Sequence, residues 1–151
     1  MMMNEGIVLG HLLSVVGIRM DPAKIKVIQH FPLPITPTQV RSFISCAGYY
    51  RRFIENFAKT SHPLFQLLTK DADFVWTDDC DATFVKIKEL VSNALILRGP
   101  DWALPFHIHS DASQTAIGAV LGQQVDKVPY AVYYVSKNLA PAELNYTMTE
   151  K

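Results

Sequence analysis

The stretch Phe106-His-Ile-His-Ser-Asp-Ala-Ser113 decides the fold of the second half of the chain. Its apolar and polar residues alternate, which is the pattern of a half-buried β-strand. Gly99-Pro100-Asp101 breaks the chain before it. Two further runs rich in strand-forming residues follow, separated by a short polar turn. The sequence therefore predicts three antiparallel strands, at residues 106–110, 116–124 and 130–135, with the turn at Asp126-Lys127.

Upstream of these strands, the sequence is organised in helices. A proline directly after an N-capping side chain starts two of them, at Asp21-Pro22 and at Thr36-Pro37. The first is expected to run to about Gln29, and the second to be followed by one more helical turn over residues 49–54. Two further helices are expected. One begins at Pro63, and the other has Asp78 as its N-cap. Apolar stripes support these helices, formed by Val40, Phe43, Ile44, Ala47, Leu64, Leu67, Leu68, Phe84, Ile87, Leu90 and Val91.

The N-terminal segment from Ile7 to Met20 is apolar and rich in β-branched residues, with Gly10 and Gly17 as turn signals. This pattern predicts a short β-hairpin. The expected fold class is therefore α+β: a short β-hairpin, a helical segment, and then three antiparallel strands.

The composition is that of a globular chain: 151 residues, of which 49% are hydrophobic. The formal net charge is zero, but residues 1–70 hold eight bases and three acids, so the remainder is acidic.

No apolar run is long enough to span a membrane and no signal peptide is evident, so we expect an intracellular chain without a membrane partner. Cys46 and Cys80 lack neighbouring Cys or His at ligand spacing and are expected to be buried thiols.

A long series of motifs in register closely resembles the Pol polyprotein of gypsy-type long-terminal-repeat retrotransposons. The part resembled runs from the end of the reverse transcriptase palm, through thumb and connection helices, into the first part of the RNase H domain. The motifs that carry the resemblance include Val8-Leu-Gly-His11, Arg41-Ser-Phe43, Gly48-Tyr-Tyr-Arg-Arg-Phe-Ile54, Phe57-Ala58, Pro63-Leu64, Pro100-Asp101-Trp102, Leu104-Pro-Phe106, Asp111-Ala-Ser113, Ile117-Gly-Ala-Val-Leu-Gly-Gln123, Ser136-Lys137 and Thr149-Glu-Lys151.

The resemblance implies a domain division and a function. Residues 1–20 would be the end of the palm, residues 21–70 a thumb-like helical segment, and residues 71–151 the connection helix and the N-terminal part of an RNase H-like domain. Asp111 matches the first carboxylate of the RNase H site, so the resemblance implies that it is a catalytic residue and a Mg²⁺ ligand. The implied partners are an RNA/DNA hybrid or primer-template and the remainder of the Pol polyprotein.

The same resemblance implies that both active sites are incomplete in these 151 residues. The family pattern continues Thr-Glu-Lys-Glu, and its second Glu is the catalytic one, whereas Glu150 matches the first. Thr147-Met-Thr-Glu150 also fits a capping box, which indicates a helix start rather than a metal ligand. Whether the chain is an enzyme is thus uncertain, and we expect no measurable RNase H or polymerase activity from it alone. Two alternatives are a non-catalytic nucleic-acid-binding module and a protein-interaction module derived from a retroelement.

Without the surrounding motifs, Asp111 would be interpreted as a turn cap, with its side chain on a backbone amide. His107 and His109 would share its face of the strand. A transition-metal site there is conceivable but not favoured, since a fourth ligand is lacking.

A basic and aromatic cluster in the helical segment is the candidate nucleic-acid interface. Guanidinium groups bind phosphates, and aromatic rings stack on sugars or bases. The alternative places the tyrosines in the core and the arginines in solvent or paired with Glu55. The resemblance to the thumb favours contact with nucleic acid. The candidate binding residues are Arg41, Tyr49, Tyr50, Arg51 and Arg52.

The remaining aromatic and histidine residues are assigned structural roles. Trp76 and Trp102 are expected to pack between modules. His11, His30 and His62 are interpreted as ordinary surface or turn residues.

Overall fold

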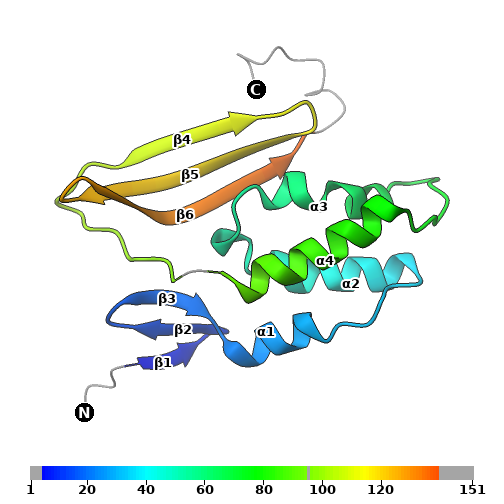
Figure 1. The fold of residues 1–151 in the computed structure, drawn as a ribbon, viewed down its shortest axis with the longest axis horizontal. Helices are drawn as coiled ribbons and strands as arrows, with labels where there is room; N and C mark the ends of the chain where they lie inside the picture. Colours follow the sequence, from blue (N-terminus) through cyan, green and yellow to red (C-terminus); the bar gives the residue numbers. More distant parts are fainter. Residues whose placement is uncertain (1–4, 95, 140–151) are drawn as a thin grey trace.

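The computed structural model describes residues 5–94 and 96–139 and contains two three-stranded antiparallel sheets joined by helices (Figure 1). The strand orders are β1-β2-β3 and β4-β5-β6. This arrangement confirms the predicted α+β class. None of the described helices is long and apolar enough to cross a membrane. The capping box predicted at residues 147–150 lies outside the described residues.

The N-terminal segment forms three strands, one more than the predicted short hairpin. They are β1 (Glu5–Val8), β2 (His11–Ser14) and β3 (Gly17–Met20). The first turn has positive φ at both Leu9 and Gly10, 50° and 76°, which is typical of a two-residue type I′ turn. Gly10 and Gly17 each mark one of the two turns, but the apolar Leu9 beside Gly10 gives no turn signal of its own.

The first two helices begin as predicted. Helix α1 (Pro22–Gln29) is capped by Asp21, whose carboxylate accepts a hydrogen bond from the Ala23 N–H at 2.9 Å. Helix α2 (Pro37–Gly48) is capped by Thr36, whose hydroxyl accepts from the Gln39 N–H at 3.2 Å. In both helices proline occupies the first helical position, where no N–H is needed.

The next segment differs from the prediction in two places. The expected helical turn over residues 49–54 is a short 3-10 helix, η1 (Arg51–Phe53). The helix expected to begin at Pro63 instead begins six residues earlier: α3 (Phe57–Gln66) contains Pro63 in its interior. The earlier start follows from a distant contact, because the free Ala58 N–H in the first turn donates to the Ser136 hydroxyl at 2.9 Å.

Helix α4 (Asp78–Ser92) begins one residue earlier than predicted, because its cap is Thr77 rather than Asp78. The Thr77 hydroxyl accepts from the Cys80 N–H at 3.3 Å. The acidic residues of the first turn lie at the positive end of the helix dipole, which they stabilise.

The helices share one hydrophobic core. Phe43 is fully buried at its centre, with its ring centroid 4.7 Å from that of Phe84 and 5.3 Å from that of Phe31. Cys80 is buried as predicted, whereas Cys46 is partly exposed. We call residues 22–92 the helical part. The buried residues of the core are Met20, Ile28, Val40, Phe43, Ile44, Ala47, Tyr50, Phe53, Ile54, Phe57, Leu64, Leu67, Cys80, Phe84, Ile87, Val91 and Leu97.

The second sheet contains β4 (His107–Ala112), β5 (Ala116–Val125) and β6 (Val128–Asn138). Each strand is longer than predicted, because pairing continues across residues outside the alternating runs. The turn at Asp126-Lys127 is confirmed, and both residues have positive φ. Strand β6 packs against η1 and α3, and β4 forms the far edge in Figure 1.

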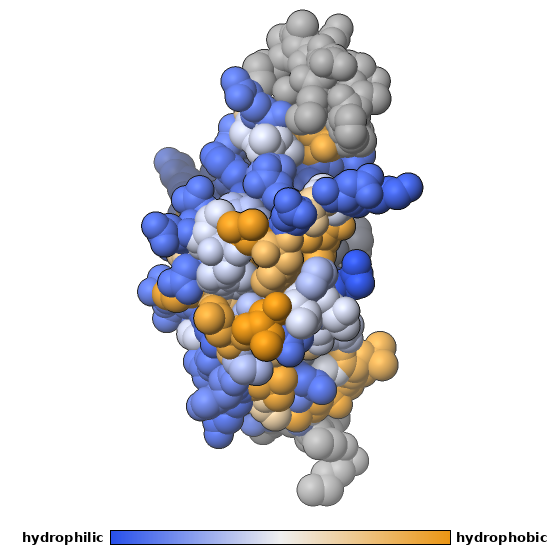
Figure 2. Space-filling model, turned by 90° about the vertical axis from the view of Figure 1, so that its right-hand side faces the viewer, coloured by the Kyte–Doolittle hydropathy of each residue, from blue (hydrophilic) through white to orange (hydrophobic). Residues whose placement is uncertain are grey.

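The two tryptophans do not pack between modules, so that prediction was wrong. Trp76 lies within the helical part, edge-on to Phe84 at 6.0 Å. Trp102 is 83% exposed and contacts Phe106. Figure 2 shows the right-hand side of Figure 1, where other apolar residues also lie on the surface between hydrophilic ones.

Candidate nucleic-acid interface and carboxylate

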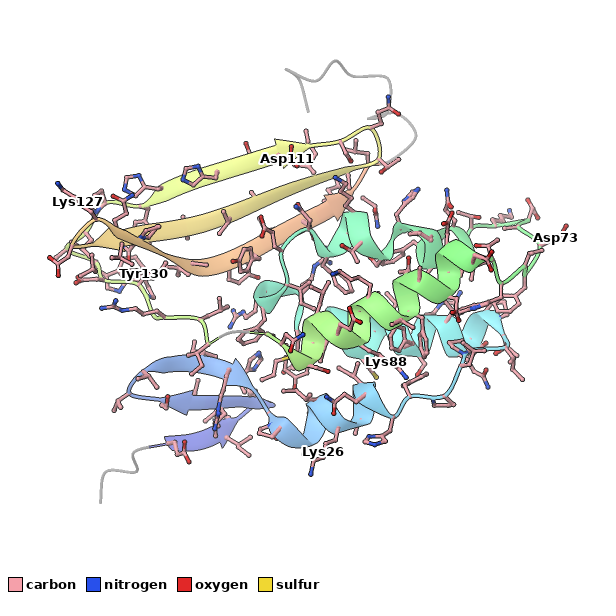
Figure 3. The ribbon with its side chains drawn as sticks, viewed as in Figure 1. Lys26, Asp73, Lys88, Asp111, Lys127 and Tyr130 are labelled. Carbon is pink, nitrogen blue, oxygen red and sulfur yellow. The ribbon has the colours of Figure 1, made fainter. Side chains whose placement is uncertain are left out.

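Asp111 lies near the end of edge strand β4, with an exposed side chain (Figure 3). It is paired with Gly118 of β5, which is paired in turn with Ser136 of β6. Residues directly opposite one another in antiparallel strands point to the same face. Since the Ser136 hydroxyl contacts the N–H of Ala58 in α3, this face is the one toward the helical part. The Asp111 carboxylate therefore stands on the helix-facing side, at the edge that the helices leave open.

The turn after β4 is held by Ser113, and Asp111 takes no part in it. The Ser113 hydroxyl accepts from the Thr115 N–H at 3.3 Å and the Ala116 N–H at 3.0 Å. No hydrogen bond joins the Asp111 side chain to another described residue. The alternative role as a turn cap therefore belongs to Ser113, and the carboxylate is left available for a ligand.

The described residues around Asp111 do not make a metal site on their own. His107 and His109 share its face and are exposed, but no group of three or more His, Cys, Asp or Glu that could hold a metal ion occurs in the described ranges. A single exposed carboxylate is a poor site for Mg²⁺, which requires several hard oxygen ligands.

The two tyrosines of the candidate interface hold the β1–β2 turn. The Tyr50 hydroxyl donates to the Gly10 carbonyl at 2.8 Å, and the Tyr49 hydroxyl donates to the Leu9 carbonyl. Tyr50 is 2% exposed, and its burial, with smaller effects of Asp21 and Tyr49, raises its pKa to about 12. Tyr49 is 55% exposed, so its ring can still meet a ligand. Tyr50 therefore matches the core alternative, whereas Tyr49 does not.

Two arginines of the candidate interface, Arg51 and Arg52, contact strand β6 of the second sheet. Arg51 donates to the Ser136 carbonyl, and its guanidinium lies 5.7 Å from the ring centroid of Phe57. The Arg52 guanidinium lies 5.0 Å from the ring centroid of Tyr133. Arg41 is exposed on α2. These contacts do not saturate the five N–H donors of a guanidinium, so binding of a phosphate remains a prediction for all three residues.

A groove of about 620 Å³ brings several of these residues together. Tyr49, Arg51 and Arg52 line it, together with residues of the N-terminal sheet. His11, interpreted from the sequence as a surface or turn residue, follows the β1–β2 turn, lines the groove and packs among three aromatic rings. Its Nε2 is buried and has no hydrogen-bond partner among the described residues.

Three residues that organise the second sheet and its junction with α3 were not predicted. Gln123 is 1% exposed; its amide accepts from the Asp101 N–H and the Tyr130 hydroxyl and donates to two carbonyls. Gly118 and Asn56 lie in contact across the junction with α3. A glycine inside a strand does indicate close approach of another segment, but the sequence gives no sign of which segment approaches.

The comparison with known families gives one match, over residues 76–151, to the RNase H-like domain found in reverse transcriptase. The chain is 38% identical over 149 residues to the "Retrovirus-related Pol polyprotein from transposon 412" of Drosophila melanogaster, covering 99% of this chain and 12% of that protein. It is 33% identical over 155 residues to the polyprotein from transposon gypsy, covering 95% of this chain and 15% of the relative. The chain thus spans less than a sixth of these relatives.

The structural comparison gives the same fold at low sequence identity. The "foamy viral protease-reverse transcriptase in complex with RNA/DNA hybrid" matches with a TM-score of 0.79 at 21% identity, over 97% of this chain and 20% of that one. A structure of the foamy viral protein with double-stranded DNA matches with a TM-score of 0.80 at 21% identity, over 97% of this chain and 26% of that one. At this identity the likeness concerns the fold alone.

Proposed function

Because the chain belongs to the family of RNase H-like domains found in reverse transcriptases, we propose that it is a segment of a retroelement Pol polyprotein that holds an RNA/DNA hybrid or primer-template. In this proposal Arg41, Arg51 and Arg52 of the helical part contact the nucleic-acid backbone, and Asp111 is one of the catalytic carboxylates of the whole polyprotein. The domain division at residues 20 and 70, from palm to thumb to connection and RNase H, is part of the same proposal.

The observation that carries the proposal is the position of Asp111. The carboxylate is exposed, free of hydrogen bonds to described residues, and on the face of the sheet toward the helical part. Arg51 and Arg52, the candidate phosphate contacts, touch the opposite edge strand of the same sheet. Basic groups and a free carboxylate therefore belong to one rigid framework, as cleavage of a bound strand requires.

The charge distribution supports the assignment of the basic side. The excess of bases in residues 1–70 includes Arg41, Arg51 and Arg52. Neutralising phosphates with such groups releases counterions, which makes binding steeply dependent on salt.

RNase H-like domains generally use divalent metal ions. The described residues provide one carboxylate at Asp111 and do not fit a Mg²⁺ ion by themselves. We therefore assign no catalytic step to the 151-residue chain, and expect it to leave a labelled RNA/DNA hybrid intact. Hydrolysis that disappears in Asp111→Asn would contradict this expectation.

The test of nucleic-acid binding is a salt titration of the affinity for a labelled hybrid. Arg52→Ala removes the guanidinium that lies 5.0 Å from the ring centroid of Tyr133. We expect weaker binding and a salt slope reduced by about one for each phosphate that the side chain no longer neutralises. Lys86→Ala on the exposed side of α4 is the matched control, expected to leave both quantities unchanged. Equal salt slopes for the parent chain and Arg52→Ala would show that Arg52 does not neutralise a phosphate of the hybrid.

A second candidate function, protein interaction, is favoured by one observation. On the face of the second sheet away from the helices, Ile108 is 73% exposed and Val135 is 52% exposed. Two large apolar residues exposed on one sheet face suit a protein contact. Ile108→Ser distinguishes the functions, because it should abolish a protein contact at this face and leave hybrid binding intact.

A further inference from the structure

Asp111, Gly118 and Ser136 form a row across the second sheet, one residue from each strand. The row ends at β6 in a fixed attachment to the helical part. The buried Ser136 hydroxyl accepts from the Ala58 N–H at 2.9 Å, and the Ser136 carbonyl accepts from Arg51. The free end of the row carries the Asp111 carboxylate.

The middle of the row is also in contact with the helical part, through Asn56. A Cβ added to Gly118 would lie 1.9 Å from the Asn56 Oδ1 and 3.1 Å from its Cγ. The Asn56 amide thus occupies the space that any side chain at residue 118 would need. A larger residue at this position would force the Asn56 side chain to turn aside or β5 to move away from the N-terminus of α3.

The conformation of Asn56 is unusual and fits this role. Its φ is 53°, in the left-handed region, where asparagine is tolerated better than most residues. It stands at the N-cap of α3 but makes no side-chain capping hydrogen bond. Its amide therefore points to β5 instead of to the free N–H groups of its own helix.

We propose that Asn56 is a positioning residue for Asp111: its amide, seated on Gly118, sets where the carboxylate stands relative to the basic helical part. This inference rests on the proposed function, since it concerns the carboxylate and the hybrid named there. Gly118 contacts the N-cap residue of α3, and Ser136 is hydrogen-bonded to its first turn. These two contacts together define the direction of the row. The direction of the row in turn determines the place of Asp111 at its end.

The positioning role of Asn56 has a geometric consequence that can be measured without nucleic acid. Unless the Asn56 side chain turns aside, the contact in Gly118→Ala opens by roughly 1.5 Å before the new methyl group reaches ordinary contact at 3.4 Å. Opening at the middle of the row rotates β4 about the attachment at Ser136. We therefore expect the distance between β4 and the helical part to shift and its distribution to widen.

Paired spin labels report this distance. The labelled positions are Lys26→Cys on α1 and Ile108→Cys on β4, both exposed, in a Cys46→Ser background. The native Cys80 is 2% exposed, which shields it from the label. Gly118→Ala and Asn56→Gly should each widen the distribution. The double variant Asn56→Gly/Gly118→Ala has room for the methyl group and should return toward the parent distance.

The controls separate positioning from general packing. Gly99→Ala places a methyl group in open space, with nothing within 4 Å, and should leave the distance unchanged. An unchanged distance in both Gly118→Ala and Asn56→Gly would overturn the proposal, because Asn56 would then turn aside without effect. If Gly118→Ala fails to fold, Asn56→Gly alone still decides the question.

A second experiment relates the position of Asp111 to the bound nucleic acid. An iron chelate attached at Asp111→Cys cuts a bound hybrid at the nucleotides nearest this residue. The proposal expects one narrow window of cuts in the parent background and a broader window when Asn56→Gly is added, with hybrid affinity unchanged. An equally narrow window would overturn the positioning role. If no variant binds hybrid, the proposed function fails, while the spin-label distances still test Asn56.

Discussion

The helical part and the second sheet are stabilised in different ways. The helical part contains nearly all of the buried apolar residues, including Phe43, Phe57 and Leu64, which are at most 1% exposed. Strand β4 of the second sheet has no buried residue at all. Two of the buried side chains of that sheet, Gln123 and Ser136, are polar and make hydrogen bonds. Apolar packing therefore stabilises one region, and directed polar contacts hold the other in place.

The largest effect is expected from Phe43→Ala, which tests the apolar side of this comparison. Phe43 is 0% exposed and contacts two other aromatic rings, so its truncation leaves a cavity. We expect a loss of about 3–5 kcal/mol in the free energy of unfolding. Urea denaturation followed by far-UV circular dichroism measures it. Val85→Ala, at a half-exposed position of α4, is the control and should cost far less.

The difference between the regions also explains which parts of the fold could be predicted. The starts of α1 and α2 depend on Asp21 and Thr36, whose capping bonds reach two or three residues along the chain. Such local signals can be read from a sequence. The first turn of α3 is bonded to Ser136, far along the chain, and the local signal at Pro63 predicted a later start.

The candidate site, too, could be predicted only where local sequence signals mark it. Asp111 was found from a resemblance, and its strand from local alternation. The contact between Asn56 and Gly118 joins two segments whose proximity arises only when the sheet meets the helices. The exposure of Trp102 was missed for a related reason: the loop that carries it is held by Gln123 rather than by packing of its own ring. Tertiary polar contacts leave no periodic pattern in a sequence.

High pH should weaken the helical part in particular, through Tyr50. Its pKa is about 12 in the folded chain, against 10.0 for an unperturbed tyrosine. Between these two pH values the unfolded chain loses the phenolic proton while the folded chain keeps it, so stability falls as pH rises. The expected loss is about 2–3 kcal/mol by pH 12, and stability is unaffected by this group below pH 10. Burial also raises the pKa of Tyr134, on the second sheet, which adds a loss of the same sign.

Urea denaturation at pH 9 and pH 11 measures the part of this loss that is reached by pH 11, about 1.3 kcal/mol. Tyr50→Phe should reduce the difference between the two pH values, at the cost of the hydrogen bond to Gly10. Tyr49→Phe removes a neighbouring hydroxyl that also donates to the β1–β2 turn, and should keep the pH dependence. An undiminished pH dependence in Tyr50→Phe would mean that other groups control stability in this range.

The smallest of the three effects is expected from Gln123→Leu, which tests the polar side of the comparison. The substitution removes hydrogen bonds to Asp101, Leu104 and Tyr130 while keeping an apolar side chain of similar size. We expect a loss of about 1–3 kcal/mol, because partly buried backbone groups lose their partners. The loss should be local: hydrogen exchange at the Asp101 amide should accelerate and Trp102 fluorescence anisotropy should fall. Exchange in α2 should stay unchanged, since the hydrogen bonds of Gln123 all go to residues outside the helical part. A matching increase in exchange throughout the helical part would show that the two regions unfold as one unit, and that the contrast between them does not extend to their stability.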